Sequence, residues 1–196
     1  MLAPTDAARA GVVARFALDE ARVRPQAPVT EPRRVDGPES RAEFGLGPDD
    51  LAVGITARIQ PHRRFDLLWA TARRVVDRVP RARFVLLGRG NAEDTEALVR
   101  APVRELGLAA HVVLPGYRKG ADYDRALRAL DAFLFLVPGS DGTCRAVSDA
   151  MAFGLPVVAT RRGILPHLLA ERRPGEVPGF ACEEDPDALS TALVRL

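Results

Sequence analysis

The sequence lacks long apolar segments. Its longest uninterrupted apolar stretches, such as residues 132–137, are far shorter than the roughly 20 residues that a membrane-spanning helix needs. The first residues, Met1 to Asp6, have neither the basic start nor the apolar run of a secretory signal peptide. We therefore expect a soluble, cytoplasmic protein.

Cysteine is also scarce, since the chain contains only Cys144 and Cys182. Two cysteines in 196 residues form neither a disulfide framework nor a metal site built on sulfur ligands. We expect both thiols to be reduced.

Lysine is nearly absent, because Lys119 is the only lysine among 28 basic residues. These basic residues stand against 26 acidic ones, which leaves a net charge of +2. The arginines are scattered among carboxylates and form no basic stripe of the kind that binds nucleic acid. A nucleic-acid partner is therefore not expected.

From residue 51 onward, short apolar runs alternate with amphipathic segments of helix length at a nearly constant interval. This pattern of successive βαβ units predicts an α/β fold, with a Rossmann-like parallel sheet of about six strands and helices on both faces. None of the runs alternates cleanly between apolar and polar residues, as expected for strands that are buried on both faces. The expected strands are 51–56, 83–87, 111–114, 132–137, 156–160 and 179–182.

Helices are expected between these strands. Residues 65–79 place apolar side chains at a spacing of three to four, which predicts an amphipathic helix. Asn91 followed by Asp94 gives the next helix a capping signal, and Pro102 is expected to end or kink that helix. Further helices are expected over 122–130, 143–153 and 163–170 and from Asp185-Pro186 onward.

The first 48 residues have a different character. Residues 5–18 favour a helix and residues 22–29 an extended piece, whereas four prolines among charged residues in 25–38 are typical of a linker. We therefore divide the chain into an adjunct, residues 1–48, and a domain, residues 49–196. The last helical pattern runs to Leu196 without a stop signal, so we expect this domain to be truncated at its C-terminus.

In an open parallel sheet, ligands bind at the carboxyl ends of the strands, where helix N-termini present free N–H groups. After residues 132–137, a glycine-bearing turn opens the helix that carries Asp149, and such a turn lets the backbone approach a phosphate closely. After residues 51–56, Arg58, Arg63 and Arg64 fall within seven positions. Guanidinium groups there can grip a diphosphate, each desolvated bond contributing on the order of 1.5 to 3 kcal/mol. Solvated loop charge is the alternative interpretation.

These pieces fall in the order of one known pattern. Arg58-Ile59 and Arg63 are followed by the segments 84–90 and 113–117 and then by Asp-Ala-Met-Ala-Phe-Gly-Leu-Pro-Val-Val-Ala-Thr at residues 149–160. Over residues 45–196 the sequence resembles the C-terminal, donor-binding domain of GT-B-fold retaining glycosyltransferases of the group 1 family, whose members include bacterial glycogen synthase and sucrose-phosphate synthase. The resemblance implies one half of a GT-B fold.

The resemblance implies a catalytic role for three residues. Arg58 matches the arginine of the family pattern and Arg63 matches its lysine, and the two would hold the donor diphosphate and help the leaving phosphate depart. Both remain cationic here, although arginine is a planar fork and lysine a point charge. Asp141 stands for the first of two family glutamates, close to the transferred sugar.

The resemblance also implies a set of donor-binding residues. Asp149 stands for the second glutamate, which contacts the ribose hydroxyls. Backbone N–H groups for the phosphates and the sugar would come from Gly142, Thr143, Cys144 and Arg145. The positions near the nucleoside would be Gly88, Gly90, Gly116 and Tyr117.

The sequence departs from the family pattern at several positions. Ala57 stands where the family has glycine before the arginine, and Arg64 stands where glycine follows the lysine. Residues 143–145 stand where the family has Phe-Gly-Leu, so that Cys144 occupies a glycine position. Residues 163–167 stand where the family has a Gly-Gly turn that is followed by an acidic residue. These departures bear on activity more than on fold.

A metal site is not expected. Asp122-Tyr123-Asp124 looks like the metal-binding Asp-x-Asp of other glycosyltransferases, but it begins a predicted helix, where carboxylates complement the helix dipole. The three histidines, His62, His111 and His167, have no ligand spacing. We therefore expect neither a metal nor any other cofactor.

We expect the chain to bind a nucleotide-diphosphate sugar, as the donor domain of a retaining glycosyltransferase whose N-terminal acceptor domain is missing. Any peripheral membrane contact would then be made only by that missing domain, and the chain alone would transfer no sugar. Two alternatives stay open. One is a non-catalytic nucleotide-sugar binding module, whose chemistry the substitutions at 57, 64, 141, 143–145 and 164 have erased. The other is a nucleotide-sugar epimerase of the same fold.

Overall fold

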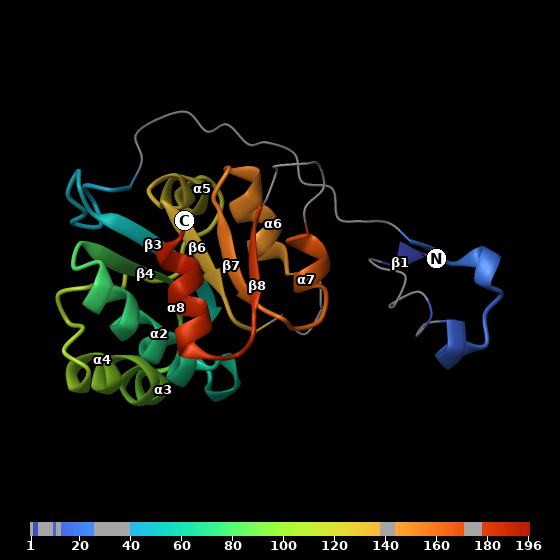
Figure 1. Cartoon of the computed structure of the whole chain (residues 1–196), viewed down its shortest axis with the longest axis horizontal. Coiled ribbons are helices and arrows are strands. Elements are labelled where there is room, and N and C mark those ends of the chain that lie inside the picture. The colour runs from blue at the N-terminus through green and yellow to red at the C-terminus, as the bar shows by residue number, and fades with distance from the viewer. Residues whose placement is uncertain (1, 4–9, 11–12, 26–39, 138–143, 171–177) are drawn as a thin grey trace.

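The computed structural model of the chain describes residues 2–3, 10, 13–25, 40–137, 144–170 and 178–196. Six strands of the described residues form one parallel sheet in the order β5-β4-β3-β6-β7-β8 (Figure 1). They are β3 (Leu51–Arg58), β4 (Ala82–Arg89), β5 (Val112–Val113), β6 (Ala132–Phe135), β7 (Val157–Thr160) and β8 (Gly179–Cys182). Each lies where the sequence predicts a strand, so the predicted Rossmann-like fold is confirmed.

The strand order fixes the position of a binding crevice. Along the chain, β4 and β5 add to one side of β3, and β6, β7 and β8 add to the other. Connections on the two sides therefore leave β3 in opposite directions, which opens a crevice at the carboxyl ends of β3 and β6.

Helices cover both faces of the sheet. In chain order they are α2 (Phe65–Arg78), α3 (Ala92–Thr95), the π-helical turn η3 (Glu96–Arg100), α4 (Ala101–Glu105), α5 (Ala121–Arg128), α6 (Arg145–Ala152), α7 (Leu165–Leu168) and α8 (Pro186–Val194). The side chain of Asn91 caps α3 by accepting a hydrogen bond of 2.6 Å from the N–H of Asp94, and Asp185 caps α8 in the same way through Ala188. Both caps were predicted. None of the helices in the described residues is long and apolar enough to cross a bilayer.

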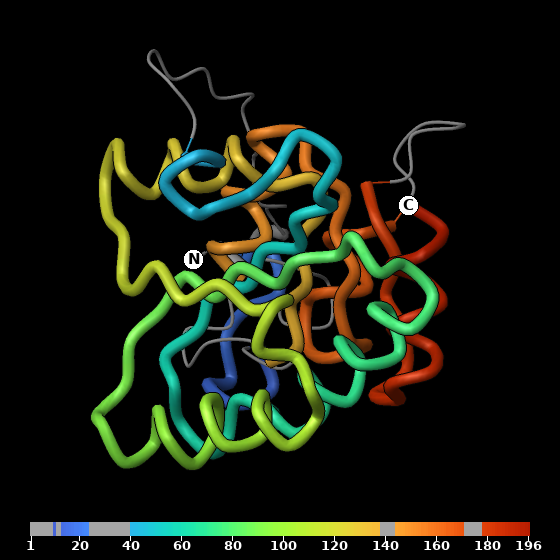
Figure 2. Tube along the Cα trace, turned by 90° about the vertical axis from the view of Figure 1, so that its left-hand side faces the viewer, coloured from blue at the N-terminus to red at the C-terminus, as the bar shows by residue number. Residues whose placement is uncertain are grey.

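Alternate residues of each strand enter two separate cores, as the period of a strand requires. On one face, Ile55 and Phe84 pack with α2, η3 and α8, and α2 and α8 lie side by side in both views (Figures 1 and 2). On the other face, Val85 and Phe133 pack with α5, α6 and α7. Burial on both faces explains why the strands show no alternation of polar and apolar residues.

Pro102 lies in the first turn of α4, directly after the π-helical turn η3, so the regular α-helical pattern of α3 changes just before the proline. A proline at this position cannot donate a hydrogen bond to the carbonyl of Leu98, four residues earlier. The indole Nε1 of Trp69 donates to that carbonyl instead, at 2.7 Å. A side chain of α2 thus replaces the missing helical donor.

Residues 40–48, which the predicted division places in the adjunct, pack on the sheet. Phe44 and Leu46 are buried in the core that contains α5 and α6. Arg41 donates hydrogen bonds to the carbonyls of Gly47 and Asp50, at 2.9 and 2.8 Å, and forms an ion pair with Asp131. This segment is therefore fixed to the domain, while the division of the chain at residue 48 stays a prediction.

The described residues nearer the N-terminus form short elements. Residues 13–16 are helical, Glu20–Arg22 form a 3-10 turn, and β1 (Leu2–Ala3) pairs in parallel with β2 (Arg24–Pro25). The predicted helix over 5–18 and the extended piece over 22–29 fall partly outside the described residues.

Candidate functional site

A cavity of about 290 Å³ lies at the carboxyl ends of β3 and β4 and reaches the first residues of α6. It is formed by Thr56, Ala57, Arg58, Arg63, Leu87, Gly88, Arg89, Tyr117, Phe135, Cys144, Arg145 and Ala146. This volume is near the lower end of the range for small-ligand sites. Six of the predicted site residues are therefore gathered here: Arg58, Arg63, Gly88, Tyr117, Cys144 and Arg145.

The cavity carries positive charge. Four of the residues around it are arginines, and none of the described residues around it is acidic. Arg58, Arg89 and Arg145 are exposed and form no ion pair with any other described residue, whereas arginines elsewhere in the chain are commonly paired with carboxylates. Their charge is therefore available to a ligand, and the walls of a cleft focus such a field on an anion.

Arg58 and Arg89 are neighbours across the sheet. Arg58 is the last residue of β3 and pairs in register with Arg89, the last residue of β4. No role was predicted for Arg89 from the sequence. The sequence could have indicated this position. If the strand that ends at Arg58 pairs in register with the strand that ends at Arg89, the two arginines lie side by side.

Arg63 reaches the cavity from the turn that follows β3. It ends the 3-10 turn η2 (Pro61–Arg63), is half-buried, and its Nη1 donates a hydrogen bond to the carbonyl of Val137 at 3.2 Å. Val137 follows β6, so this bond fixes the turn after β3 to the carboxyl end of the neighbouring strand.

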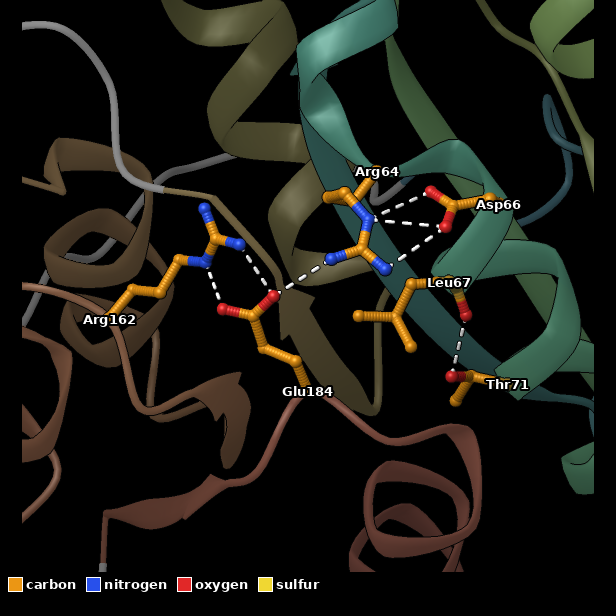
Figure 3. A network of polar contacts seen from close by, with 6 residues as sticks. All are labelled: Arg64, Asp66, Leu67, Thr71, Arg162 and Glu184. Carbon is orange, nitrogen blue, oxygen red and sulfur yellow. Dashed lines mark hydrogen bonds and ion pairs between the residues drawn. The ribbon is translucent and has the colours of Figure 1, made fainter.

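Arg64 turns the chain from η2 into α2 with left-handed backbone angles, φ 57° and ψ 47°. This conformation explains why glycine is the residue of the family pattern at this position. The guanidinium of Arg64 forms ion pairs with Asp66 and Glu184, and Glu184 also pairs with Arg162 (Figure 3). The hydrogen bond from Arg64 lowers the pKa of Asp66, and the hydrogen bond from Arg162 lowers the pKa of Glu184.

Gly88 and Gly90 are required by packing between strands. A Cβ atom at Gly88 would lie 1.9 Å from the carbonyl oxygen of Ala57, and one at Gly90 would lie 2.7 Å from the Cβ of Ile59. Gly88 borders the cavity, whereas Gly90 is not among the residues that form it. Close approach of β3 and β4 is thus one sufficient reason for both glycines.

Tyr117 stands at the rim of the cavity with 58% of its surface exposed. The guanidinium of Arg89 lies 4.8 Å from the centre of its ring, within the range of a cation–π contact. The preceding Gly116 has a φ of +82°, a value that side chains other than glycine rarely adopt. Gly116 shapes this turn but does not itself border the cavity.

Cys144 begins α6 in a left-handed conformation, φ 52° and ψ 43°, with only 2% of its surface exposed. Its carbonyl accepts a hydrogen bond from the N–H of Val147 at 2.8 Å, which closes the first turn. Arg145 is exposed on that turn, and Asp149 is half-buried one turn further along without reaching the cavity. Asp141, Gly142 and Thr143 lie outside the described residues.

The Asp-x-Asp segment lies in the first turn of α5, as the sequence predicted. Asp122 forms an ion pair with Arg125, and the hydroxyl of Tyr123 lies 3.4 Å from that of Thr56. In the described part of the chain, no three His, Cys, Asp or Glu residues are grouped so that they could hold a metal ion. Nδ1 of His111 lies within hydrogen-bond distance of the carbonyl of Ala82, at the edge of the sheet.

Comparison with known proteins gives a family match over most of the chain. The family described as "Glycosyl transferases group 1" matches residues 50–196. This range begins within two residues of the predicted start of the domain and contains all the residues that form the cavity.

Two curated relatives illustrate the sequence similarity. The D-inositol 3-phosphate glycosyltransferase of Mycobacteroides abscessus is 33% identical over 164 residues, which cover 82% of this chain and 36% of that protein. The enzyme of the same name from Actinosynnema mirum is 30% identical over 203 residues, which cover 97% of this chain and 48% of that protein. The chain thus spans between one third and one half of the length of these relatives.

Solved structures share the fold at lower sequence identity. HepE from Anabaena, in complex with UDP and glucose, matches with a TM-score of 0.77 and 19% identity over 99% of this chain and 52% of that one. The C-terminal domain of a group 1 family glycosyl transferase from Francisella tularensis matches with a TM-score of 0.64 and 20% identity. It covers 86% of this chain and 85% of that domain.

Proposed function

The chain belongs to the group 1 glycosyl transferase family, and from that premise we propose that its arginine-lined cavity binds the diphosphate of a nucleotide-sugar donor. One observation carries the proposal: four arginines and no described acidic residue surround a cavity at the carboxyl ends of β3 and β4. Charge-assisted hydrogen bonds from guanidinium groups suit phosphate oxygens. The UDP bound in the HepE structure supports the same class of ligand.

The proposed reaction is transfer of the sugar to an acceptor hydroxyl with retention of configuration. The bond between the anomeric carbon and the diphosphate oxygen breaks, and the diphosphate departs with the electron pair. The acceptor oxygen bonds to the same carbon, and its proton passes to an oxygen of the departing diphosphate. Arg58 and Arg63 would stabilise the negative charge that grows on the departing diphosphate, which is the form of catalysis expected from cations fixed beside the leaving group.

We assign the donor site, and not the acceptor site, to this chain. The matched structure of similar extent is itself a C-terminal domain, and the curated relatives are at least twice as long as the matched region. The acceptor would be bound by a further domain, as in two-domain glycosyltransferases. Asp141 and Asp149 keep their proposed roles beside the sugar and the ribose.

The backbone at two of the substituted positions is compatible with the donor site. Arg64 and Cys144 stand where the family pattern has glycine, yet both keep left-handed backbone angles. The turns that open α2 and α6 therefore have a backbone conformation that glycine adopts readily, although their side chains differ from the family pattern.

Titration calorimetry with UDP tests the donor site. We expect Arg58→Ala and Arg63→Ala each to weaken UDP binding about tenfold or more, because each removes a charge-assisted contact. Arg104→Ala is the matched control, since this arginine is exposed and paired with Glu96 on another part of the surface. Binding should also weaken as salt concentration rises.

Equal UDP affinity in the wild type and both cavity variants would refute the proposed site. The same titrations address the metal. We propose that arginines neutralise the diphosphate without a divalent cation, so UDP affinity should be the same in EDTA and in magnesium chloride. A strong dependence on magnesium would overturn this part of the proposal.

A further inference from the structure

A network of charged side chains lies beside the cavity without forming its wall (Figure 3). Nη1 of Arg64 lies 2.8 Å from Oε2 of Glu184, and Nη2 of Arg162 lies 2.5 Å from the same oxygen. Nε of Arg64 lies 3.0 Å from Oδ1 of Asp66. One carboxylate, that of Glu184, is thus shared by two arginines from different loops.

The network joins segments that follow three different strands. Arg64 follows β3 through η2, Arg162 follows β7, and Glu184 follows β8. In the sheet, β6 and β7 lie between β3 and β8. The contact between Arg64 and Glu184 therefore crosses the carboxyl ends of two strands, including the end of β6 that adjoins the cavity.

The turn held by this contact carries Arg63. Arg63 and Arg64 are consecutive, and the left-handed backbone of Arg64 sends one side chain into the cavity and the other toward Glu184. The bond from Arg63 to the carbonyl of Val137 fixes the same turn from the cavity side. A left-handed backbone costs roughly 1–2 kcal/mol at residues other than glycine, so the turn needs contacts that hold it.

We propose that Arg64 and Glu184 are positioning residues, which hold the η2 turn so that Arg63 faces the donor diphosphate. This inference rests on the proposed function, because the ligand of Arg63 is the proposed diphosphate. Glu184 does not border the cavity and acts on the ligand only through Arg63. Arg162 orients the Glu184 carboxylate by binding both of its oxygens.

The test is a double-mutant cycle on UDP affinity between Glu184→Gln and Arg63→Ala, measured by calorimetry. Glutamine keeps the size of the side chain and removes its charge. The groups are about one third exposed, so we expect Glu184→Gln to weaken UDP binding by about three- to fivefold, the range of a partly exposed ion pair. In the Arg63→Ala background the same substitution should have no effect, because its only route to the ligand is gone.

The matched control is Asp187→Asn. Asp187 pairs with Arg74 at 2.6 Å and so also joins α8 to α2, but neither residue borders the cavity. We expect this variant to bind UDP like the wild type. Uridine is a second control, because it lacks phosphate and its affinity should not respond to Glu184→Gln.

The outcomes separate the two proposals. Loss of UDP binding in Arg63→Ala with no change in Glu184→Gln would overturn the positioning role and leave the donor site standing. An equal loss from Glu184→Gln in both backgrounds would indicate a general structural effect and would also overturn it. If the wild type bound no UDP, the proposed donor site would be refuted. Hydrogen exchange would still test whether the contact between Arg64 and Glu184 holds the η2 turn. Amides of residues 62–66 should then exchange faster in Glu184→Gln than in Asp187→Asn, and equal exchange would contradict the proposed holding of the η2 turn by Arg64 and Glu184.

Discussion

Arg64 and Cys144 each begin a helix from a left-handed backbone conformation. At residues with a Cβ atom this conformation costs roughly 1–2 kcal/mol. The two sites accommodate that cost differently, because Arg64 gains ion pairs at the surface and Cys144 buries its side chain. A left-handed residue is thus adjacent to each of two cavity arginines, Arg63 and Arg145.

The strain at Cys144 can be measured by comparing Cys144→Gly with Cys144→Ala. Both variants lose the buried thiol, but only glycine relieves the left-handed backbone, and its larger unfolded-state entropy offsets part of that gain. We expect Cys144→Gly to be about 0.5–1 kcal/mol more stable than Cys144→Ala in urea unfolding. Alanine equal to or better than glycine would show that the backbone here is not strained.

The sequence could predict that Arg58 and Arg63 meet at the cavity, but it missed Arg89 and did not indicate how the backbones of the turns are arranged. Arg58 and Arg63 follow one strand closely, so the topology alone brings them to the carboxyl edge. Nothing in an arginine or a cysteine indicates a positive φ, because both residues normally avoid it. The only indication of these conformations was that the family pattern has glycine at the positions of Arg64 and Cys144.

At the scale of elements, α2 and the segment from α3 to α4 depend on each other. Trp69 is almost fully buried, and its indole donates to the carbonyl that Pro102 leaves without a helical donor. A proline in the middle of a helix is usually a break, but here a side chain from a different helix completes the hydrogen bonding. The change from α3 through the π-helical turn η3 to α4 lies where the sequence predicted an end or kink at Pro102.

A stability cycle between Trp69→Phe and Pro102→Ala tests this dependence. Phenylalanine fills much of the space but leaves the carbonyl of Leu98 without its donor, which should cost about 1–3 kcal/mol in addition to lost packing. In the Pro102→Ala background the alanine N–H can supply the donor, so the cost of Trp69→Phe should be smaller there. Additive effects in urea unfolding of the four proteins would contradict the account.

The strands were the most predictable elements. All six lie at predicted positions because each is a short apolar run bounded by glycine, proline or charge. The ends were less predictable: β3 and β4 extend to Arg58 and Arg89, whereas β5 contains only Val112 and Val113. Ladder pairing with a neighbour sets these ends, and β5 at the edge of the sheet pairs only with β4.

At the scale of the whole molecule, the sheet combines two cores with one charged edge. The helices bury both faces, so the carboxyl ends of the strands are where the cavity arginines can meet a ligand. The ion pair between Arg64 and Glu184 links the segment after β3 to the segment after β8 at this edge. The proposed donor site would therefore depend on the complete sheet, and the segment after β8 would contribute to it through Glu184 without bordering the cavity.

We expect the 196-residue chain to bind UDP and to transfer no sugar. Diphosphate binding requires only the cavity, whereas transfer also requires an acceptor hydroxyl held against the anomeric carbon in a reactive geometry. The matched regions span 36% and 48% of two curated relatives, each named D-inositol 3-phosphate glycosyltransferase. Incubation with radiolabelled UDP-glucose and D-inositol 3-phosphate, followed by separation of the products, should give no labelled glycoside. Calorimetry with UDP on the same preparation shows that the site is intact, and a labelled glycoside above background would place acceptor binding within this chain.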